Sequence, residues 1–337
     1  MQEIKINKKT AGGRCDKAVM KYLDKAGAGF IYKMLRKKNI VLNDHRAKGD
    51  EILNDGDVIK LYLADDTISK FRTGISVVTD TGAVKNDLCS EFVKMIVFED
   101  DNIIAFNKPA GVLSQKSSPG DISVNDMLVS YLGRTDLFTP GISNRLDRNT
   151  SGLMLAGKNP MSVRLLNEAI KNRNLRKYYI CATVGKMPLT ADIDGYLIKD
   201  DRKNTVSVCS TVPAGLSVKE KPAYIKTSCR LLDSNDRISL AEIDLITGRP
   251  HQIRAHLASE GHPIIGDPKY GKKEINRIYA EKYGISCQLL HSFRVCFEGM
   301  HGELAYLNNT EIKAPLPLNM KKMIKGEGLC LPGLQED

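Results

Sequence analysis

The chain has 337 residues, with 42% hydrophobic and 27% charged side chains, which is typical of a soluble globular enzyme. This length is long for one domain and allows a large core together with a small accessory domain. The 50 Lys and Arg against 40 Asp and Glu give a formal net charge of +10 at pH 7, which favours a polyanionic partner such as nucleic acid. Charge alone leaves open the alternative of a generally basic protein without such a partner.

Eight cysteines are scattered along the chain without a C-x-x-C pair. This spacing argues against a disulfide framework and against a zinc ribbon, so most of them are expected in the core as small apolar side chains. The first residues, MQEIKINKKT, contain no apolar stretch of signal-peptide length, and no run approaches the roughly 20 apolar residues that cross a bilayer. We therefore expect a cytoplasmic, reduced protein without membrane contact.

Residues 1–64 form a short unit rich in Lys and Arg, and its pattern predicts the order helix, helix, strand, strand. The helices are predicted over 14–23 and 30–37, and the strands over 40–42 and 58–61. A turn made of Asn, Asp and Gly precedes the last strand. We expect a small α+β domain.

The second of these helices is predicted to be amphipathic. Its apolar side chains recur at helical spacing, while Lys33, Arg36 and Lys37 fall largely on the opposite face. Taken alone, such a cluster is more often a solvated helix face than a binding site. However, the run 30–43 followed by 55–59 resembles the S4 RNA-binding domain, and this resemblance implies that the three cations contact RNA.

One position departs from the S4 pattern. After Leu35-Arg36-Lys37 that family usually has Gly, which ends the helix in the left-handed conformation, whereas this chain has Lys38. A Lys in that conformation costs about 1 kcal/mol. We expect the helix to end differently, with Lys38 adding charge to the binding face.

Residues 65–92 show no strong periodicity and are interpreted as a linker, and from residue 93 to about 330 a denser alternation of strands and helices predicts a second domain. Strands over 95–98 and 103–106 lead into a loop shaped by Pro and Gly that carries Lys108. Such a lysine can approach a phosphate or a nearby carboxylate, and we expect Lys108 to bind RNA. The alternative is a plain loop lysine.

Residues 144–152, NRLDRNTSG, are the most informative stretch. Asp147 lies between Arg145 and Arg148 and just before an apolar strand predicted over 153–156. Neighbouring guanidinium groups favour an ionised carboxylate, which can act as a nucleophile or a base. For an arbitrary R-x-D-R a structural salt bridge is the commoner explanation.

Two further stretches carry polar side chains on predicted strands and helices. A helix signalled by Asn159 as N-cap and Pro160 leads to a strand over 177–185, in which one of Tyr178 and Tyr179 must point inward. The inward ring could stack on a base, although core packing is the commoner role. Within 247–271 a second helix is predicted.

That later helix is predicted from Pro250 to Glu260, where Gly261 closes it. Arg254 lies one step round from its core face and can reach a carboxylate on a neighbouring loop. His251 and His256 lie five residues apart rather than four, and there is no H-E-x-x-H, so the spacing argues against a metal site.

In order and spacing, the stretches 107–112, 145–153, 177–185 and 247–271 resemble the RluA family of RNA pseudouridine synthases, over about residues 93–318. With the S4-like unit in front, the chain is most similar to the large-subunit ribosomal RNA enzymes of that family, the RluC group. The resemblance implies an α+β fold around a mixed, largely antiparallel sheet.

The resemblance also implies roles for single residues. Asp147 matches the catalytic aspartate, Tyr179 the tyrosine that packs on the target base, and Arg254 the arginine that pairs with the carboxylate. Arg145 matches an arginine that holds the place of the flipped nucleotide. The family usually has His where this chain has Asn144, which could alter how the loop holds RNA.

The implied reaction converts uridine to pseudouridine and needs neither cofactor nor metal, consistent with a sequence that has no Gly-rich nucleotide loop. We expect a monomer acting on RNA, specifically 23S ribosomal RNA. The sequence leaves open the same reaction on tRNA, and a catalytically silent S4-domain ribosome-assembly factor. It also does not choose among attack of the carboxylate at C1′, attack at C6, and proton abstraction on a glycal path.

Overall fold

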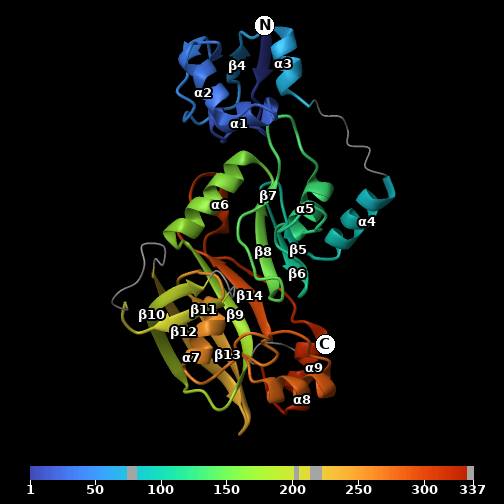
Figure 1. Cartoon of the computed structure of the whole chain (residues 1–337), viewed down its shortest axis with the longest axis vertical. Helices are drawn as coiled ribbons and strands as arrows, with labels where there is room; N and C mark the ends of the chain where they lie inside the picture. Colours follow the sequence, from blue (N-terminus) through green and yellow to red (C-terminus); the bar gives the residue numbers. More distant parts are fainter. Residues whose placement is uncertain (74–81, 201–204, 213–221, 332–337) are drawn as a thin grey trace.

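The computed structural model describes residues 1–73, 82–200, 205–212 and 222–331. The molecule is elongated, with the N-terminal unit at one end and a large sheet with its helices making up the rest (Figure 1). The two bodies have separate hydrophobic cores. They touch where Arg72 forms an ion pair with Asp136 at 2.7 Å and where the backbone of Gly12 packs against Met161.

The N-terminal unit is a four-stranded antiparallel sheet covered by helices. Its strand order is β1-β4-β2-β3, and α1 and α2 pack on it through a shared apolar core. Both predicted helices and the two predicted strands are confirmed within two residues at each end. The edge strands β1 and β3 were not predicted, because they are short and lack an alternating apolar pattern. The bounds are β1 (Gln2–Lys5), α1 (Cys15–Tyr22), α2 (Ala28–Arg36), β2 (Ile40–Leu42), β3 (His45–Arg46) and β4 (Val58–Leu61).

The end of α2 corrects the expectation for Lys38. This residue adopts the left-handed conformation itself, with φ 60°. The amide of Asn39 donates to the carbonyl of Met34 at 3.0 Å, and the amide of Lys38 donates to that of Leu35 at 3.1 Å. The helix therefore ends as it would with glycine, at the cost of backbone strain, and Lys38 is exposed.

The segment 65–92, interpreted as a linker, contains two helices, α3 (Asp65–Phe71) and α4 (Gly82–Val93). The ring of Phe71 packs on Phe30 at 4.5 Å between centroids, so α3 belongs to the N-terminal core. At the end of α4 the buried Phe92 packs on Phe106 of the second core. The sequence of this segment has too little periodicity to predict these helices. They are stabilised by tertiary packing more than by local propensity.

The second body is built on an eleven-stranded sheet with the order β11-β10-β12-β13-β9-β14-β8-β6-β5, with β15 paired to β14 and β7 to β8. Among the described strands every ladder is antiparallel except that between β8 and β14. This confirms the predicted α+β fold with a mixed, largely antiparallel sheet. The strands are β5 (Ile96–Glu99), β6 (Ile103–Lys108), β7 (Gly141–Ile142), β8 (Ser151–Gly157), β9 (Leu175–Val184), β10 (Thr190–Asp200), β11 (Thr205–Cys209), β12 (Ala223–Ser234), β13 (Ile238–Leu245), β14 (Leu290–Phe297) and β15 (Glu311–Lys313).

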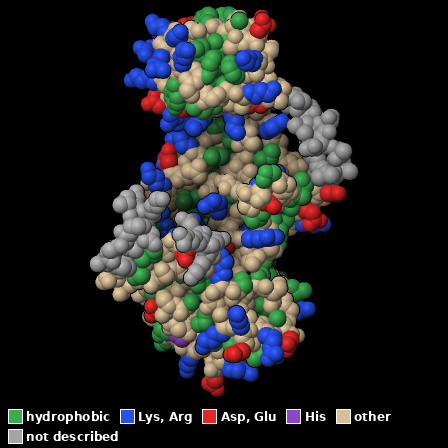
Figure 2. All heavy atoms as spheres, in the orientation of Figure 1, with side chains coloured by type: hydrophobic (Ala, Val, Ile, Leu, Met, Phe, Trp, Pro, Cys, Tyr) green, Lys and Arg blue, Asp and Glu red, His purple; other side chains and the backbone are tan. Residues whose placement is uncertain are grey.

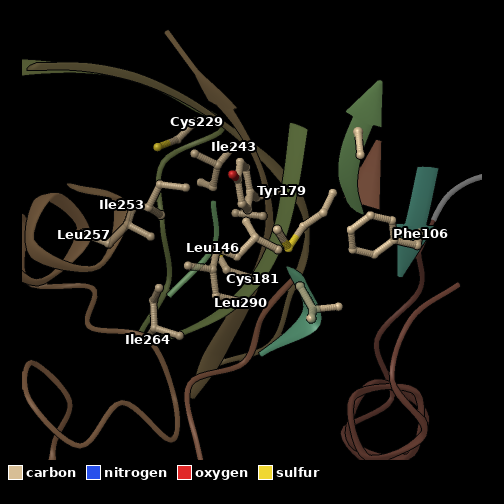
Figure 3. Packing of buried hydrophobic residues seen from close by; sticks show 14 of the residues in the cluster. Phe106, Leu146, Tyr179, Cys181, Cys229, Ile243, Ile253, Leu257, Ile264 and Leu290 are labelled. Atoms are coloured by element: carbon tan, nitrogen blue, oxygen red, sulfur yellow. The ribbon is translucent and has the colours of Figure 1, made fainter. Parts of the chain in front are cut away.

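Helices cover this sheet and divide its core into clusters. The cluster that supports the cleft described below packs Tyr179 and Leu146 with Ile243, Ile253 and other apolar side chains (Figure 3). The predicted N-cap of α6 is confirmed, since the Asn159 side chain accepts from the amide of Ser162 at 2.8 Å. The helices are α5 (Val124–Leu132), α6 (Pro160–Asn172), α7 (Gln252–Ser259), α8 (Lys273–Tyr283) and α9 (Leu318–Gly326), with a 3₁₀ turn over Gly302–Leu307.

Strand β8 meets β14 at a position that only glycine allows. Gly152 has φ 115°, and a Cβ there would lie 2.3 Å from the carbonyl oxygen of Ser292. The chain leaves the 144–150 loop directly into this contact. The close approach therefore fixes where that loop sits on the sheet.

We predict that Gly152→Ala lowers the free energy of unfolding by at least about 2 kcal/mol, because backbone strain and a clash with Ser292 act together. Gly284→Ala is the matched control: this residue also has positive φ, 68°, but a Cβ would meet nothing within 4 Å, so a loss of about 1 kcal/mol is expected. Urea unfolding followed by circular dichroism measures both. Equal losses would contradict the importance of the close approach.

Candidate active site

A cleft of about 620 Å³ opens on the second body beside the 144–152 loop. It is lined by all three later stretches that the sequence singled out, around Asp147, Tyr179 and Arg254, and also by residues 113–117. On the face drawn in Figure 2, Lys and Arg side chains lie on the N-terminal unit and across the middle of the molecule. The surroundings of the cleft are thus suited to an anionic ligand.

Asp147 is held by Arg254 from α7. Its Oδ2 accepts a hydrogen bond from Nη1 of Arg254 at 2.9 Å. The other side of the guanidinium makes two bonds to Asp267, from Nε at 2.6 Å and from Nη2 at 2.9 Å. Arg254 therefore bridges two carboxylates, one on each side.

The two carboxylates differ in exposure. The Asp267 side chain is fully buried, whereas that of Asp147 is 27% exposed and faces the cleft. Burial alone would raise the pKa of Asp267, but the hydrogen bonds and charge of Arg254 outweigh it and lower that pKa. Burial likewise disfavours the charged form of Arg254, yet the two carboxylates raise its pKa. The result is a fixed positive group with one carboxylate available to a ligand.

The arginines beside Asp147 in the sequence do not hold it, which corrects that part of the prediction. Arg148 donates from Nε to the carbonyl of Gly111 at 2.9 Å, and Arg145 is exposed at the edge of the cleft. Residues adjacent along a tight loop point in different directions. The partner of Asp147 instead comes from 107 positions further along the chain.

The backbone of the loop is fixed from beneath. The Ser114 hydroxyl donates to the carbonyl of Leu146 at 2.7 Å and accepts from its amide at 3.1 Å. The amide of Thr150 closes the turn on the carbonyl of Asp147 at 3.1 Å. Asn144 stands where the resembling family has His. Its side-chain oxygen accepts a hydrogen bond from the amide of Leu155, in the strand that follows, at 2.8 Å. Asn144 thus has a structural role in this chain.

Lys108 was predicted to contact RNA, and the structure contradicts this. The residue is fully buried at the end of β6. Its Nζ donates to the carbonyls of Pro109, Val112 and Arg148 at 2.9, 2.9 and 3.0 Å. These three acceptors satisfy all the donors of the ammonium group, so it ties two loops together instead of reaching a phosphate. Burial lowers the pKa of Lys108 to about 8, against the attraction of Asp147.

Tyr179 is the inward member of the tyrosine pair, as the alternation of a strand requires. Its ring is 5% exposed and lines the cleft, and burial raises the pKa of its hydroxyl to about 12. Tyr178 points to the other face, where the guanidinium of Arg294 lies 4.1 Å from its ring centroid. On the same face as Tyr179, the partly buried Lys177 also lines the cleft, and burial lowers the pKa of its amine.

Helix α7 begins at Gln252, not at Pro250 as predicted, because His251 is in the left-handed conformation with φ 55°. The Gln252 side chain fixes the preceding loop: it donates to Thr227 at 3.0 Å and accepts from the Thr247 hydroxyl at 2.9 Å. This bend brings His251 into the cleft, with its Nε2 3.8 Å from Oδ2 of Asp147.

The sequence missed four residues in and around the cleft: Asp267, His251, Tyr270 and Lys177. All four lie in the stretches quoted for the resemblance, which was the available signal. Periodicity could not pair them, because each contact joins different elements of the fold.

The basic cluster of α2 lies on the other body. Lys33, Arg36 and Lys37 are exposed, opposite the buried apolar face of that helix, as predicted. The structure does not bring them into the cleft. Any RNA that meets both must extend along the molecule (Figure 1).

Within the described residues, no group of three or more His, Cys, Asp or Glu side chains is placed to hold a metal ion. In the same part of the chain, no helix has the length and apolarity needed to cross a membrane.

Comparison with known proteins finds similar proteins that cover most of the chain. A family model described as RNA pseudouridylate synthase matches residues 102–259. Ribosomal large subunit pseudouridine synthase C of Rickettsia felis is 30% identical over 310 residues, 90% of this chain and 93% of that protein. The protein of the same name from Vibrio parahaemolyticus is 26% identical, covering 97% of this chain and 96% of that protein. The solved structure of human RNA pseudouridylate synthase domain containing 4 matches 75% of this chain and all of that one, with a TM-score of 0.60 and 22% identity, and so supports the fold.

We predict that Asp267→Asn lowers the free energy of unfolding at pH 7 by about 3 kcal/mol, because it leaves the buried Arg254 without its main partner. Since the pKa of Asp267 is lowered in the folded protein, its stabilisation is complete above the ordinary value of about 3.9 and is lost as the pH falls through the lower folded-state value. The variant should therefore lose less stability than the wild type on acidification.

Thermal unfolding measured from pH 7 down to pH 3 checks this. The exposed Asp101→Asn serves as the control and should follow the wild type. Parallel pH curves for the wild type and Asp267→Asn would contradict the assignment of the buried ion pair.

Proposed function

Because the chain belongs to the RNA pseudouridylate synthase family and isomerises uridine to pseudouridine in RNA, we propose that its substrate is large-subunit ribosomal RNA and that Asp147 is its nucleophile. The names of its relatives support the target, and so does the basic N-terminal unit. We further propose, from the sequence alone, that the protein acts as a cytoplasmic monomer.

The observation that carries the proposal is the chain of contacts Asp267–Arg254–Asp147. It fixes one oxygen of a partly exposed carboxylate by a hydrogen bond at 2.9 Å to a buried cation. Among the described residues, the other oxygen, Oδ1, accepts no hydrogen bond. Asp147 thus has one oxygen anchored by Arg254 and one, Oδ1, open to the reacting atoms of the substrate, in a cleft lined by Tyr179.

The reaction breaks the N1–C1′ bond of uridine, turns the uracil and joins C5 to C1′; C5 loses its proton and N1 takes up one. No oxidant or second substrate is needed, since the product is an isomer. The uracil must leave the helical stack to reach a cleft of this depth. We assign the Tyr179 ring to packing on the uracil, and the exposed Arg145 to the space that the flipped nucleotide leaves.

Arg254 holds the carboxylate in a fixed orientation, and a charge-assisted bond is strongest in a partly dry site such as this one. Attack at C1′, attack at C6 and proton abstraction on a glycal path all require an anionic carboxylate. The proposal is therefore common to the three paths.

Two other functions are weighed against this proposal. The first is the same reaction on tRNA, to which the extra basic unit lends no support. The second is a silent ribosome-assembly factor that binds RNA through the S4-like unit alone. Against it stand the intact ion pair of Asp147 with Arg254 and the buried Tyr179 beside them.

We predict that Asp147→Asn lowers pseudouridine formation at least about a thousandfold, because the amide cannot act as an anionic nucleophile or base. Pseudouridines are mapped in ribosomal RNA and tRNA from cells that lack the gene and carry the wild type, Asp147→Asn or the control Asp101→Asn. Sites in large-subunit ribosomal RNA should be restored by the wild type and the control only. Restoration by Asp147→Asn would overturn the nucleophile, and restoration confined to tRNA would overturn the target.

The cations of α2 are predicted to supply affinity without contributing to chemistry. Replacing Lys33, Arg36 and Lys37 together by Ala should weaken binding to ribosomal RNA, and it should reduce the slope of log affinity against log salt by about 2 to 3, since each phosphate contact contributes about one. Turnover at saturating RNA should stay within about twofold of the wild type. Filter binding over a range of salt concentrations measures the slope, and an unchanged slope would contradict the role.

A further inference from the structure

His251 is held in an unfavourable conformation beside Asp147. Its φ of 55° lies in the left-handed region, which is strained for a residue with a Cβ. Its side chain is only 13% exposed and lines the cleft. Nothing in the roles assigned above uses this imidazole, so the position of the ring calls for an explanation.

The hydrogen bonds around His251 determine which ring nitrogen carries the hydrogen. The hydroxyl oxygen of Tyr270 accepts from the amide of Val206 at 2.9 Å and lies 3.0 Å from Nδ1 of His251. Among the described residues, Nδ1 is the acceptor within reach of the phenol's hydrogen, and a partly buried phenol normally donates. Nδ1 therefore accepts, and in the neutral ring the hydrogen is on Nε2.

The ring is neutral for a physical reason. Burial lowers the pKa of His251 and outweighs the attraction of Asp147, while Arg254 and Lys269 lower it further and Asp267 opposes them. These four charged groups and the hydroxyl of Tyr270 surround the ring. His251 thus presents an N–H toward the cleft at neutral pH without adding a charge to it.

The distance from that nitrogen to Asp147 matches a bridging hydroxyl group. Nε2 lies 3.8 Å from Oδ2, too far for a direct hydrogen bond. For a hydroxyl oxygen placed about 2.8 Å from both atoms, the angle between the directions to Nε2 and Oδ2 is roughly 85°. This angle allows the hydroxyl to accept from Nε2 and donate to the carboxylate. Only a group that is both donor and acceptor satisfies both partners.

Resting on the proposed function, we propose that His251 is a positioning residue that donates from Nε2 to the ribose 2′-hydroxyl of the target uridine, which in turn donates to Asp147. The 2′-hydroxyl is the ribose group next to C1′ that can do both, and it distinguishes RNA from DNA. Tyr270 acts through His251 by fixing its tautomer. The strained backbone at position 251 is what places the ring there.

The test is a double-mutant cycle on binding, which needs no turnover. The probes are two RNA oligonucleotides that carry the product pseudouridine, with and without its 2′-hydroxyl. The wild type should bind the deoxy form about tenfold more weakly, whereas His251→Asn should bind the two within about twofold. Asn tolerates the left-handed backbone but is too short to replace Nε2. His251→Gln, whose amide reaches further, should keep most of the difference.

A tenfold difference that persists in His251→Asn would overturn the contact, even if turnover still depends on Asp147 as the proposed function requires. Nitrogen NMR of the wild type supplies a second measurement that does not depend on any variant. It should show Nδ1 unprotonated in the free protein, and Tyr270→Phe should give a mixture of the two tautomers. A proton on Nδ1 in the wild type would overturn the proposal.

Discussion

The structure of the site depends on one buried guanidinium shared by two carboxylates. Taking Arg254 out of water is costly, and the cost is offset only because Asp267 binds it on one side and Asp147 on the other. The two partners are unequal: Asp267 is fully buried and makes two bonds to Arg254, whereas the partly exposed Asp147 makes one. Within the part of the chain that the structure describes, the other oxygen of Asp147 accepts no hydrogen bond. That asymmetry separates the anchoring carboxylate from the one that meets a substrate.

A second constraint is the satisfaction of buried backbone groups beneath the loop. A tight turn at the surface of a sheet leaves carbonyl oxygens pointing inward, and each must find a donor. Lys108 donates three of these bonds and Ser114 another, so these polar side chains stabilise the conformation of the loop. The charge of Lys108 is thus turned toward the backbone, which explains why its appearance in a loop sequence did not mean contact with RNA.

The charged groups of the two bodies act over different distances. Cations on α2 act on a polyanion at long range and need little geometric precision, whereas the Asp147 site acts at hydrogen-bond distance. Helix α3 belongs to the first body through Phe71, and the ion pair of Arg72 with Asp136 joins it to the second. The segment 65–92 between the two predicted domains is therefore partly helical and packed, which its weak periodicity did not indicate.

The sequence by itself determined the elements with strong periodicity or clear caps, such as α2 and α6, and it identified the segments that carry Asp147, Tyr179 and Arg254 through a family resemblance. These features are local, because apolar spacing and capping act within a few residues. Only the tertiary structure decided how most of these side chains meet. It pairs Asp147 with Arg254, as the resemblance implied, and not with the flanking Arg145 and Arg148. It also buries Lys108 and places His251 and Asp267 around the carboxylate. The contact of Asp147 with Arg254 joins positions 107 residues apart, and no local pattern specifies it, since packing of the whole sheet sets the distance.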